Sequence, residues 1–192
     1  MAGVGPAAGG AADAELVALA LSGNQAGFAA LLGRYRDAVY RLVHSHLGDH
    51  GEALDVTQES FIAAFAALDR YDPARPFKAW VLRVALNKCR DWQRRRMVRR
   101  LFTFARPLDD ALGVADSAPD PEVALASAQE VTRLRTAMAA LPGKLKDPLI
   151  LCALEGLSQD EAAAVLGVSR KTVETRIYRA RQKLTQMLEG LA

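Results

Sequence analysis

GLSQDEAAAVLGVSRKTVETRIYRARQKL, at residues 156–184, has the pattern of a short helix, a tight turn and a longer basic helix. Ser158 precedes Glu161 by three residues, the capping-box spacing in which each side chain satisfies a backbone N–H at the start of a helix. Gly167 tolerates the left-handed backbone that ends the first helix, and Ser169 can cap the second. These signals together predict two helices joined by a turn.

The second of these helices has two unlike faces. An apolar stripe recurs at steps of four, three and four residues, at Val173, Ile177, Ala180 and Leu184. The opposite face is polar and basic, with Lys171, Thr172, Thr175, Tyr178, Arg179 and Gln182. A helical hairpin with a solvated outer face would share the stripe. The agreement of caps, turn glycine and basic face favours a helix-turn-helix that binds in the DNA major groove.

Composition supports an all-helical protein with an anionic partner. The chain has 192 residues, enough for one large domain or two small ones, and 51% of them are hydrophobic. No alternating pattern persists that would predict strands. The formal net charge is only +3, but basic residues cluster at 83–106 and 170–183. Such uneven positive charge indicates a polyanion partner.

Cysteine usage and hydropathy bear on the compartment. Cys89 and Cys152 lie far apart, each without a neighbouring cysteine, so we expect free thiols in a reducing compartment. No apolar run has membrane-spanning length, and the N-terminus lacks the layout of a signal peptide. We therefore predict a cytoplasmic protein without membrane insertion and without a cofactor.

Along the chain, predicted helices alternate with segments whose composition disfavours a helix. Residues 1–13 are rich in Gly and Ala and are expected to be disordered. Helical periodicity predicts helices over residues 14–21, 25–47, 52–68, 77–100 and 127–140, with a further helix reaching residue 155. Asp147-Pro148 could cap that last helix or kink it, and the sequence leaves both open. The acidic, proline-interrupted stretch at 102–128 is expected to be a flexible linker between two small helical domains, at 14–101 and 129–192.

The helix predicted at 52–68 has an apolar face that includes Leu54 and Phe61. Its other face carries Asp55, Gln58 and Glu59. An acidic, amide-bearing face of this kind is either solvated or a binding surface, and composition does not distinguish the two.

The helix predicted at 77–100 follows a proline-rich loop at 71–76. One side of this helix carries a stripe of polar and basic residues, namely Arg83, Asn87, Arg90 and Arg94, and its end is rich in arginine. A run of arginines can be a solvated helix end. The aligned stripe favours contacts with phosphate groups.

Three motifs in this order carry a family resemblance: DVTQESFIAAF at 55–65, FKAWVLRVALNKCRDWQRR at 77–95, and LPGKLKDPLILCALEGLSQDEAAAVLGVSRKTVETRIYRAR at 141–181. With them the chain resembles bacterial RNA polymerase sigma factors of the extracytoplasmic-function (ECF, group IV) class, which keep only sigma domains 2 and 4. The resemblance spans residues 25–188. It implies a non-enzymatic protein that directs RNA polymerase core to promoters.

The resemblance also implies roles for particular residues. Those expected to contact the β′ clamp helices of the polymerase are Asp55, Gln58, Glu59 and Phe61. Those expected at the −10 element are Tyr71, Arg83, Asn87, Arg90, Arg94 and Arg95, with Asn87 at a base edge, Tyr71 lining a pocket for a flipped base, and the arginines on phosphates. Those expected at the −35 element are Arg170, Lys171, Thr172, Glu174, Thr175, Arg176, Tyr178 and Arg179. An anti-sigma factor is the regulatory partner that the family implies.

Two details depart from the family pattern. The loop at 71–76 has two prolines and no glycine, which stiffens it and affects which base it accepts. Glu174 is acidic at a base-facing position, where it can accept a hydrogen bond from a cytosine or pair with Arg170.

Two other functions account for parts of the sequence. A stand-alone helix-turn-helix regulator explains residues 156–184 but gives no role to the stripe around Asn87. A metal protein or enzyme would need His44, His46 and His50, yet no cysteine or carboxylate completes a ligand set, so we expect no metal.

Overall fold

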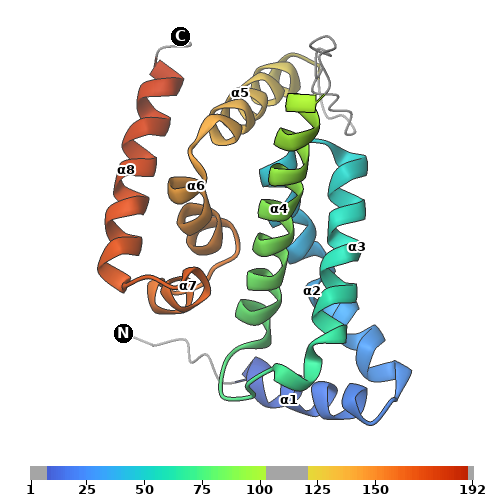
Figure 1. Cartoon of the computed structure of the whole chain (residues 1–192). Helices are drawn as coiled ribbons and strands as arrows, with labels where there is room; N and C mark the ends of the chain where they lie inside the picture. The colour runs from blue at the N-terminus through green and yellow to red at the C-terminus, as the bar shows by residue number, and fades with distance from the viewer. Residues whose placement is uncertain (1–7, 103–120, 190–192) are drawn as a thin grey trace.

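The computed structural model describes residues 8–102 and 121–189. Every regular element in these ranges is helical (Figure 1), and none is a strand, which confirms the all-α fold class. The elements are α1 (Ala8–Leu21), α2 (Gln25–Leu47), α3 (His50–Ala66), the 3-10 turn η1 (Leu68–Arg70), α4 (Phe77–Phe102), α5 (Pro121–Ala140), α6 (Gly143–Leu149), the π-helical turn η2 (Ile150–Leu154), α7 (Gln159–Leu166) and α8 (Arg170–Glu189). We refer to α1–α4 as the N-terminal half and to α5–α8 as the C-terminal half.

In the N-terminal half, α2, α3 and α4 form a bundle and α1 runs across one end of it (Figure 1). Local signals set the boundaries of these helices. Asn24 caps α2 by accepting a hydrogen bond from the Ala26 N–H, and Asp49 caps α3 by accepting one from the Glu52 N–H. Gly48 ends α2 in the left-handed conformation, with φ of 80°.

Helix α1 begins earlier than the composition indicates. The expected disorder of residues 1–13 is wrong for residues 8–13, and residues 1–7 lie outside the described part. Asp13 is only 3% exposed and accepts hydrogen bonds from Arg34 Nη1 and from the Tyr35 hydroxyl, both at 2.5 Å. Close approach of α1 to α2 is possible because position 27 is glycine: a Cβ there would lie 2.6 Å from the Ala20 nitrogen. These contacts with α2 order the segment.

A cluster of aromatic rings forms the part of the N-terminal core that surrounds the start of α4. Phe77, which starts α4, is fully buried. Its ring centroid lies 5.3 Å from that of Tyr35, 5.3 Å from that of Tyr71 and 5.4 Å from that of Trp80. One expected core residue differs, because Leu54 of α3 is 40% exposed.

The C-terminal half contains a helix irregularity that the sequence left undecided. Pro148 lies inside α6, so Asp147 does not cap a new helix there. The chain then widens into the π-helical turn η2, in which the Glu155 N–H donates to the Ile150 carbonyl at 3.0 Å. Because a proline supplies no N–H to the preceding turn, a change of hydrogen-bond register near it is expected.

The predicted linker at 102–128 is shortened at both ends. Phe102 belongs to α4, and α5 starts at Pro121 rather than near residue 127, because proline is favoured in the first turn of a helix. Residues 103–120 lie outside the described part of the chain. None of the described helices is long and apolar enough to cross a bilayer.

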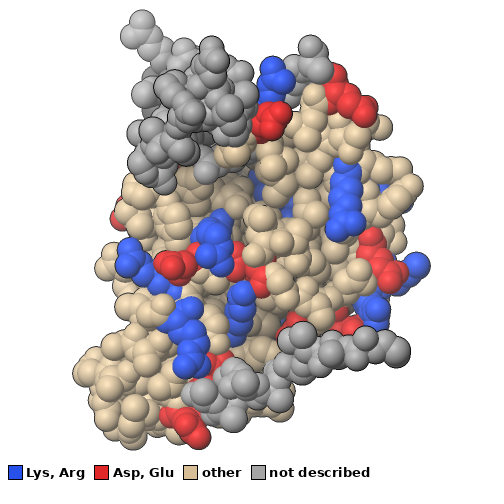
Figure 2. Space-filling view, turned by 180° about the vertical axis from the view of Figure 1, so that it is seen from behind, with Lys and Arg blue, Asp and Glu red and all other residues tan. Residues whose placement is uncertain are grey.

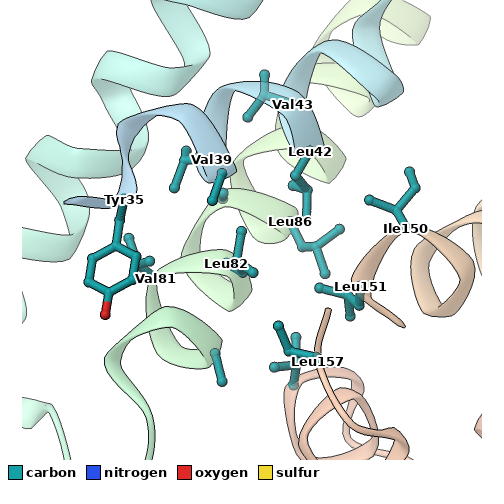
Figure 3. Close-up of a cluster of buried hydrophobic side chains, with 14 of the residues drawn as sticks. Tyr35, Val39, Leu42, Val43, Val81, Leu82, Leu86, Ile150, Leu151 and Leu157 are labelled. Atoms are coloured by element: carbon teal, nitrogen blue, oxygen red, sulfur yellow. The ribbon is translucent and has the colours of Figure 1, made fainter. Parts of the chain in front are cut away.

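The two halves share one apolar core. Figure 3 shows Ile150, Leu151 and Leu157 of the C-terminal half directed toward Leu42 of α2 and Leu86 of α4. The side chains of Leu42 and Ile150 are completely buried, so no solvent-filled gap separates the halves at this point.

Candidate functional site

The helix-turn-helix forms as its sequence predicts. The Glu161 N–H donates to Ser158 Oγ at 3.2 Å, and the Ser158 N–H donates to Glu161 Oε2 at 2.8 Å, so the capping box is confirmed. Gly167 ends α7 with φ of 67°. The Thr172 N–H donates to Ser169 Oγ at 3.2 Å, as expected of a cap at the start of α8.

Small side chains allow α7 and α8 to pack closely. Ala162 of α7 and Val173 and Ala180 of α8 are all completely buried. Ile177 is 8% exposed, and Leu184 is half-buried at the edge of this core. The apolar stripe of α8 is therefore confirmed, and it fixes which face of α8 points outward.

The outward face of α8 carries the predicted −35 residues. Arg170, Lys171, Thr175, Tyr178 and Arg179 are exposed, and Thr172, Glu174 and Arg176 are partly exposed. The Tyr178 ring is 64% exposed, and its hydroxyl accepts a hydrogen bond from Gln182 Nε2 at 2.8 Å. Donors, cations and an aromatic ring thus share one solvent-facing surface.

Glu174, the acidic residue at a predicted base-facing position, pairs with Lys171 and not with Arg170. Glu174 lies 3.1 Å from Lys171 Nζ, one turn earlier in α8. Arg170 instead lies 3.3 Å from Asp160 of α7. The suggested pairing of Glu174 with Arg170 is therefore wrong.

The predicted −10 stripe lies along α4. Arg83, Asn87, Arg90 and Arg94 are all exposed. Several of their side chains have partners within the chain: Arg94 pairs with Asp91, and Arg90 Nη2 donates to Asp147 of the C-terminal half at 2.8 Å. Arg83 and Asn87 of the stripe are therefore accessible, whereas the guanidinium of Arg90 is already hydrogen-bonded to Asp147.

Tyr71 lies beneath the loop at 71–76 and does not project from it. Tyr71 is 7% exposed, and its hydroxyl donates to the Arg75 carbonyl at 2.5 Å. Burial raises the pKa of this hydroxyl, so it stays protonated and continues to donate. The Tyr71 ring thus supports the loop from below.

The predicted polymerase-binding residues divide between surface and core. On α3, Asp55 and Gln58 are exposed and Glu59 is partly exposed, whereas Phe61 is 4% exposed and packs inside the bundle. Phe61 therefore holds the helix in place rather than presenting its ring outward.

A groove between α3 and α4 brings two predicted sites together. It encloses about 640 Å³ and is lined by Glu52, Asp55, Val56, Glu59, Trp92, Arg94, Arg95, Val98 and Arg99. Glu59 Oε2 lies 3.5 Å from Arg95 Nη2 and 3.8 Å from Lys88 Nζ. One carboxylate of the predicted polymerase-binding set, Glu59, is thus paired with one arginine of the predicted DNA-binding set, Arg95.

Two ionic contacts between the halves involve residues for which the sequence analysis predicts no role. Arg41 donates to both carboxylate oxygens of Glu155, each at 3.0 Å. Lys78 donates to the Glu155 carbonyl at 2.5 Å. Arg41 and Glu155 are separated by 114 residues, so no local pattern could have indicated this pair.

Charge elsewhere on the surface is mixed. Figure 2 shows the face opposite to that of Figure 1, where basic and acidic side chains lie beside one another within a largely uncharged surface. The positive residues do not merge into one patch on that face. Positive character concentrates on individual helices instead.

Two of the three histidines contact the same tyrosine, whereas the third has different neighbours. The His50 Nδ1 is 2.8 Å from the Tyr40 hydroxyl, and the His44 ring stacks on the Tyr40 ring with a centroid distance of 5.6 Å. His46 is buried near Asp147. Within residues 8–102 and 121–189, no three metal-ligating side chains form a group.

Comparison with known proteins identifies both halves. Residues 31–99 match the family model of Sigma-70 region 2, and residues 132–184 match that of Sigma-70 region 4. The chain is 43% identical over 182 residues to the RNA polymerase sigma factor CnrH of Cupriavidus metallidurans, covering 93% of this chain and 95% of that protein. This chain belongs to the ECF sigma factor family. It is also 31% identical to the ECF RNA polymerase sigma factor SigW of Bacillus subtilis, covering 88% of this chain and 92% of SigW.

Solved structures agree with this assignment. CnrH in complex with the cytosolic domain of CnrY superposes with a TM-score of 0.70 at 37% identity, covering 94% of this sigma factor and 99% of that chain. The fold is also that of the sigma factor RpoE solved in complex with the anti-sigma factor NepR from Bartonella quintana, with a TM-score of 0.70 at 21% identity, covering 84% and 96% of the two chains. Two sigma regions in one chain favour a sigma factor over a stand-alone regulator, and sigma factors are initiation factors rather than classical enzymes.

Proposed function

We propose that this sigma factor joins RNA polymerase core through the outward face of α3 and selects promoters with two separate helices. Residues 14–101 bind the core and the −10 element, and residues 129–192 bind the −35 element. The outward face of α8 supports this proposal most directly. It presents Lys171, Thr175 and Arg179 to solvent, opposite the apolar stripe that packs on the rest of the C-terminal half.

Within the −10 surface, Asn87 is the residue we assign to a base edge. Its side-chain amide is exposed on α4, and an amide can donate and accept at once, as base-edge recognition requires. Arg83, Arg94 and Arg95 hold phosphates on either side of it. Tyr71 shapes the neighbouring loop from beneath, because its hydroxyl is already bonded to the Arg75 carbonyl.

On the polymerase side, Asp55 and Gln58 are assigned to direct contact with the β′ clamp helices. Both are exposed on the same face of α3. Glu59 shares its carboxylate with Arg95, so it links core binding to the position of a DNA-contacting arginine. The protein acts in the cytoplasm, where polymerase is found, and an anti-sigma factor holds it inactive.

Transcription with reconstituted holoenzyme on a library of promoter sequences tests this proposal. We expect Asn87→Ala to reduce discrimination at one −10 position by about 5- to 160-fold, the equivalent of about 1–3 kcal/mol, with core affinity unchanged. Gln93→Ala is the matched control, because Gln93 is another exposed amide on α4 that lies outside the stripe. Equal loss of core binding and −10 preference in Asn87→Ala would show that the residue is misassigned.

A further inference from the structure

Two acidic residues of the C-terminal half are buried against the N-terminal half. Asp147 and Glu155 flank the π-helical turn η2, and their side chains are 8% and 0% exposed. A buried carboxylate is strongly unfavourable unless it is paired and hydrogen-bonded. The partners of both carboxylates therefore determine whether the two halves stay together.

Glu155 is held by two cations of the N-terminal half. Arg41 of α2 meets it in the two-pronged geometry, with Nε and Nη2 each 3.0 Å from a carboxylate oxygen. These hydrogen bonds raise the pKa of the Arg41 guanidinium, so Arg41 stays positively charged. Lys78 of α4 adds a contact of 3.5 Å to Glu155 Oε2.

Asp147 is held by Arg90 of α4, whose Nη2 lies 2.8 Å from Oδ2. His46 of α2 is also near, with Nε2 3.5 Å from Oδ1, but burial lowers its pKa to about 4. His46 is therefore neutral at pH 7, and its Nε2 has no hydrogen-bond partner. The ionic contact at Asp147 is that with Arg90.

Between the two ionic contacts the interface is apolar. Leu82 and Leu86 of α4 lie beside Leu151 and Leu157 of the C-terminal half (Figure 3). All four are less than 10% exposed. In such surroundings a complete ion pair is tolerated, whereas loss of one partner leaves an uncompensated charge.

The residues of α4 that face the C-terminal half recur every four positions, at Lys78, Leu82, Leu86 and Arg90. This line adjoins the −10 stripe and shares Arg90 with it, and Arg90 Nη1 lies 3.4 Å from Asn87 Oδ1. A DNA phosphate and the Asp147 carboxylate are both anions that require the same guanidinium. Arg90 can therefore meet a phosphate with both terminal nitrogens only when Asp147 releases Nη2.

We propose that Asp147 and Glu155 form a latch that holds the two halves closed and withholds Arg90 from DNA. Opening of the latch then accompanies capture of the −10 strand. The closure of the two halves does not depend on the proposed function, whereas its consequence for DNA binding rests on that function. By linkage, whatever opens the latch favours −10 binding, and −10 binding favours opening to the same extent.

The first test measures closure without reference to DNA. Spin labels at the exposed positions Ala30 of α2 and Gln186 of α8, in a Cys152→Ser background, report the distance between the halves by pulsed electron paramagnetic resonance. We expect one narrow distance in the wild type and a longer, broader distribution in Asp147→Asn/Glu155→Gln. Arg36→Gln, which removes an exposed arginine of α2 outside the described inter-half pairs, is expected to leave the distance unchanged.

A reciprocal exchange separates a latch from a folding defect. In a Lys78→Gln background, which leaves no second cation facing position 155, Arg41→Glu places two carboxylates together and should open the chain. Arg41→Glu/Glu155→Arg in the same background has the net charge of Lys78→Gln alone and should close it again. An unchanged distance in the Asp147/Glu155 variant, with helix content by circular dichroism equal to wild type, would overturn the latch. So would failure of the exchange to close the chain when its helix content is retained.

The second test measures competition for Arg90, using fluorescein-labelled single-stranded DNA of random sequence. We expect Asp147→Asn/Glu155→Gln to bind about 5- to 150-fold more tightly than wild type, the range of typical coupling between sites. Adding Arg90→Ala should abolish that gain. If the chain opens without binding DNA more tightly, Asp147 does not compete with DNA for Arg90. If no variant binds DNA, the proposed −10 surface is wrong, and the spin-label distances still test the latch on their own.

Discussion

The two halves solve the problem of building a core in different ways. The N-terminal half encloses large rings, with Phe77 fully buried among Tyr35, Tyr71 and Trp80. In α7 and α8 the fully buried side chains are Ala162, Val173 and Ala180. Small side chains bring α7 and α8 close together, but they bury little apolar area, and stabilisation scales with that area.

The C-terminal half obtains further stabilisation from its neighbour. Ile150 and Leu151 are fully buried because they meet α2 and α4, and not α8 alone (Figure 3). The N-terminal half therefore has an aromatic core of its own besides the shared apolar core, whereas the C-terminal half completes its core by docking. A docked half can be released to act elsewhere, whereas a self-contained half remains a fixed platform.

The largest expected effect is on the self-contained core. Phe77→Ala should lower the free energy of unfolding by about 3–5 kcal/mol, because it removes the ring that three other rings contact. Urea unfolding followed by circular dichroism measures the loss. Leu54→Ala, at a position that is 40% exposed, should change stability by less than about 0.5 kcal/mol. Similar losses in the two variants would mean that the aromatic cluster is not the main core.

Acidification should weaken the docked arrangement through His46. Burial lowers its pKa from 6.5 to about 4; Asp147 opposes this shift, and Lys146 and Arg90 add to it. The folded chain therefore disfavours the protonated form, so the contribution of His46 is complete above pH 6.5 and is lost as pH falls toward 4. The full effect is about 3 kcal/mol, from the pKa difference.

The measurement is the free energy of unfolding against pH for wild type and for His46→Gln. Wild type should lose stability relative to the variant between pH 6.5 and 4. His50→Gln is the control, since His50 is exposed, and its curve should follow that of wild type. Parallel curves for wild type and His46→Gln would contradict the assignment of this titration to His46.

The close packing of α7 on α8 can be tested with a matched pair of alanines. Ala162 is completely buried and Ala164 is exposed on the same helix. Ala162→Leu should destabilise the protein by about 1–3 kcal/mol through overpacking, and Ala164→Leu should be close to neutral. Thermal unfolding measures both, and equal effects would show that the helices do not depend on small residues.

The smallest expected effect concerns the start of α7. Ser158→Ala should remove the capping interaction with the Glu161 N–H and lower the free energy of unfolding by about 1 kcal/mol. Ser158→Asp should retain most of the stability, because an Asp side chain also accepts from that N–H. Urea unfolding compares the two, and equal loss in both variants would indicate that the cap does not stabilise the helix.

Structural features that depend on residues close together in the chain could be predicted from the sequence. The capping box at Ser158, the left-handed Gly167 and the buried stripe through Val173 each depend on residues within about one to three helical turns, and each is confirmed. The exposed face of α8 follows from that stripe. These predictions needed no knowledge of how the halves pack.

Features set by distant residues could not be predicted in the same way. The ordering of residues 8–13 depends on Asp13 meeting Tyr35, 22 residues away. The occupation of Arg90 depends on Asp147, 57 residues away. Asp13, Arg90 and Asp147 look like ordinary surface charges in the sequence, because nothing local indicates a buried partner.

The π-helical turn at Ile150–Leu154 makes the aim of the helix-turn-helix depend on the number of residues in the turn. Each residue of an α-helix rotates the chain by about 100°, so removing one residue from this turn would rotate everything beyond it by roughly that angle. Leu157 and Glu155 would then leave their places against α4. Insertions or deletions here are expected to be far more harmful than substitutions that keep the length.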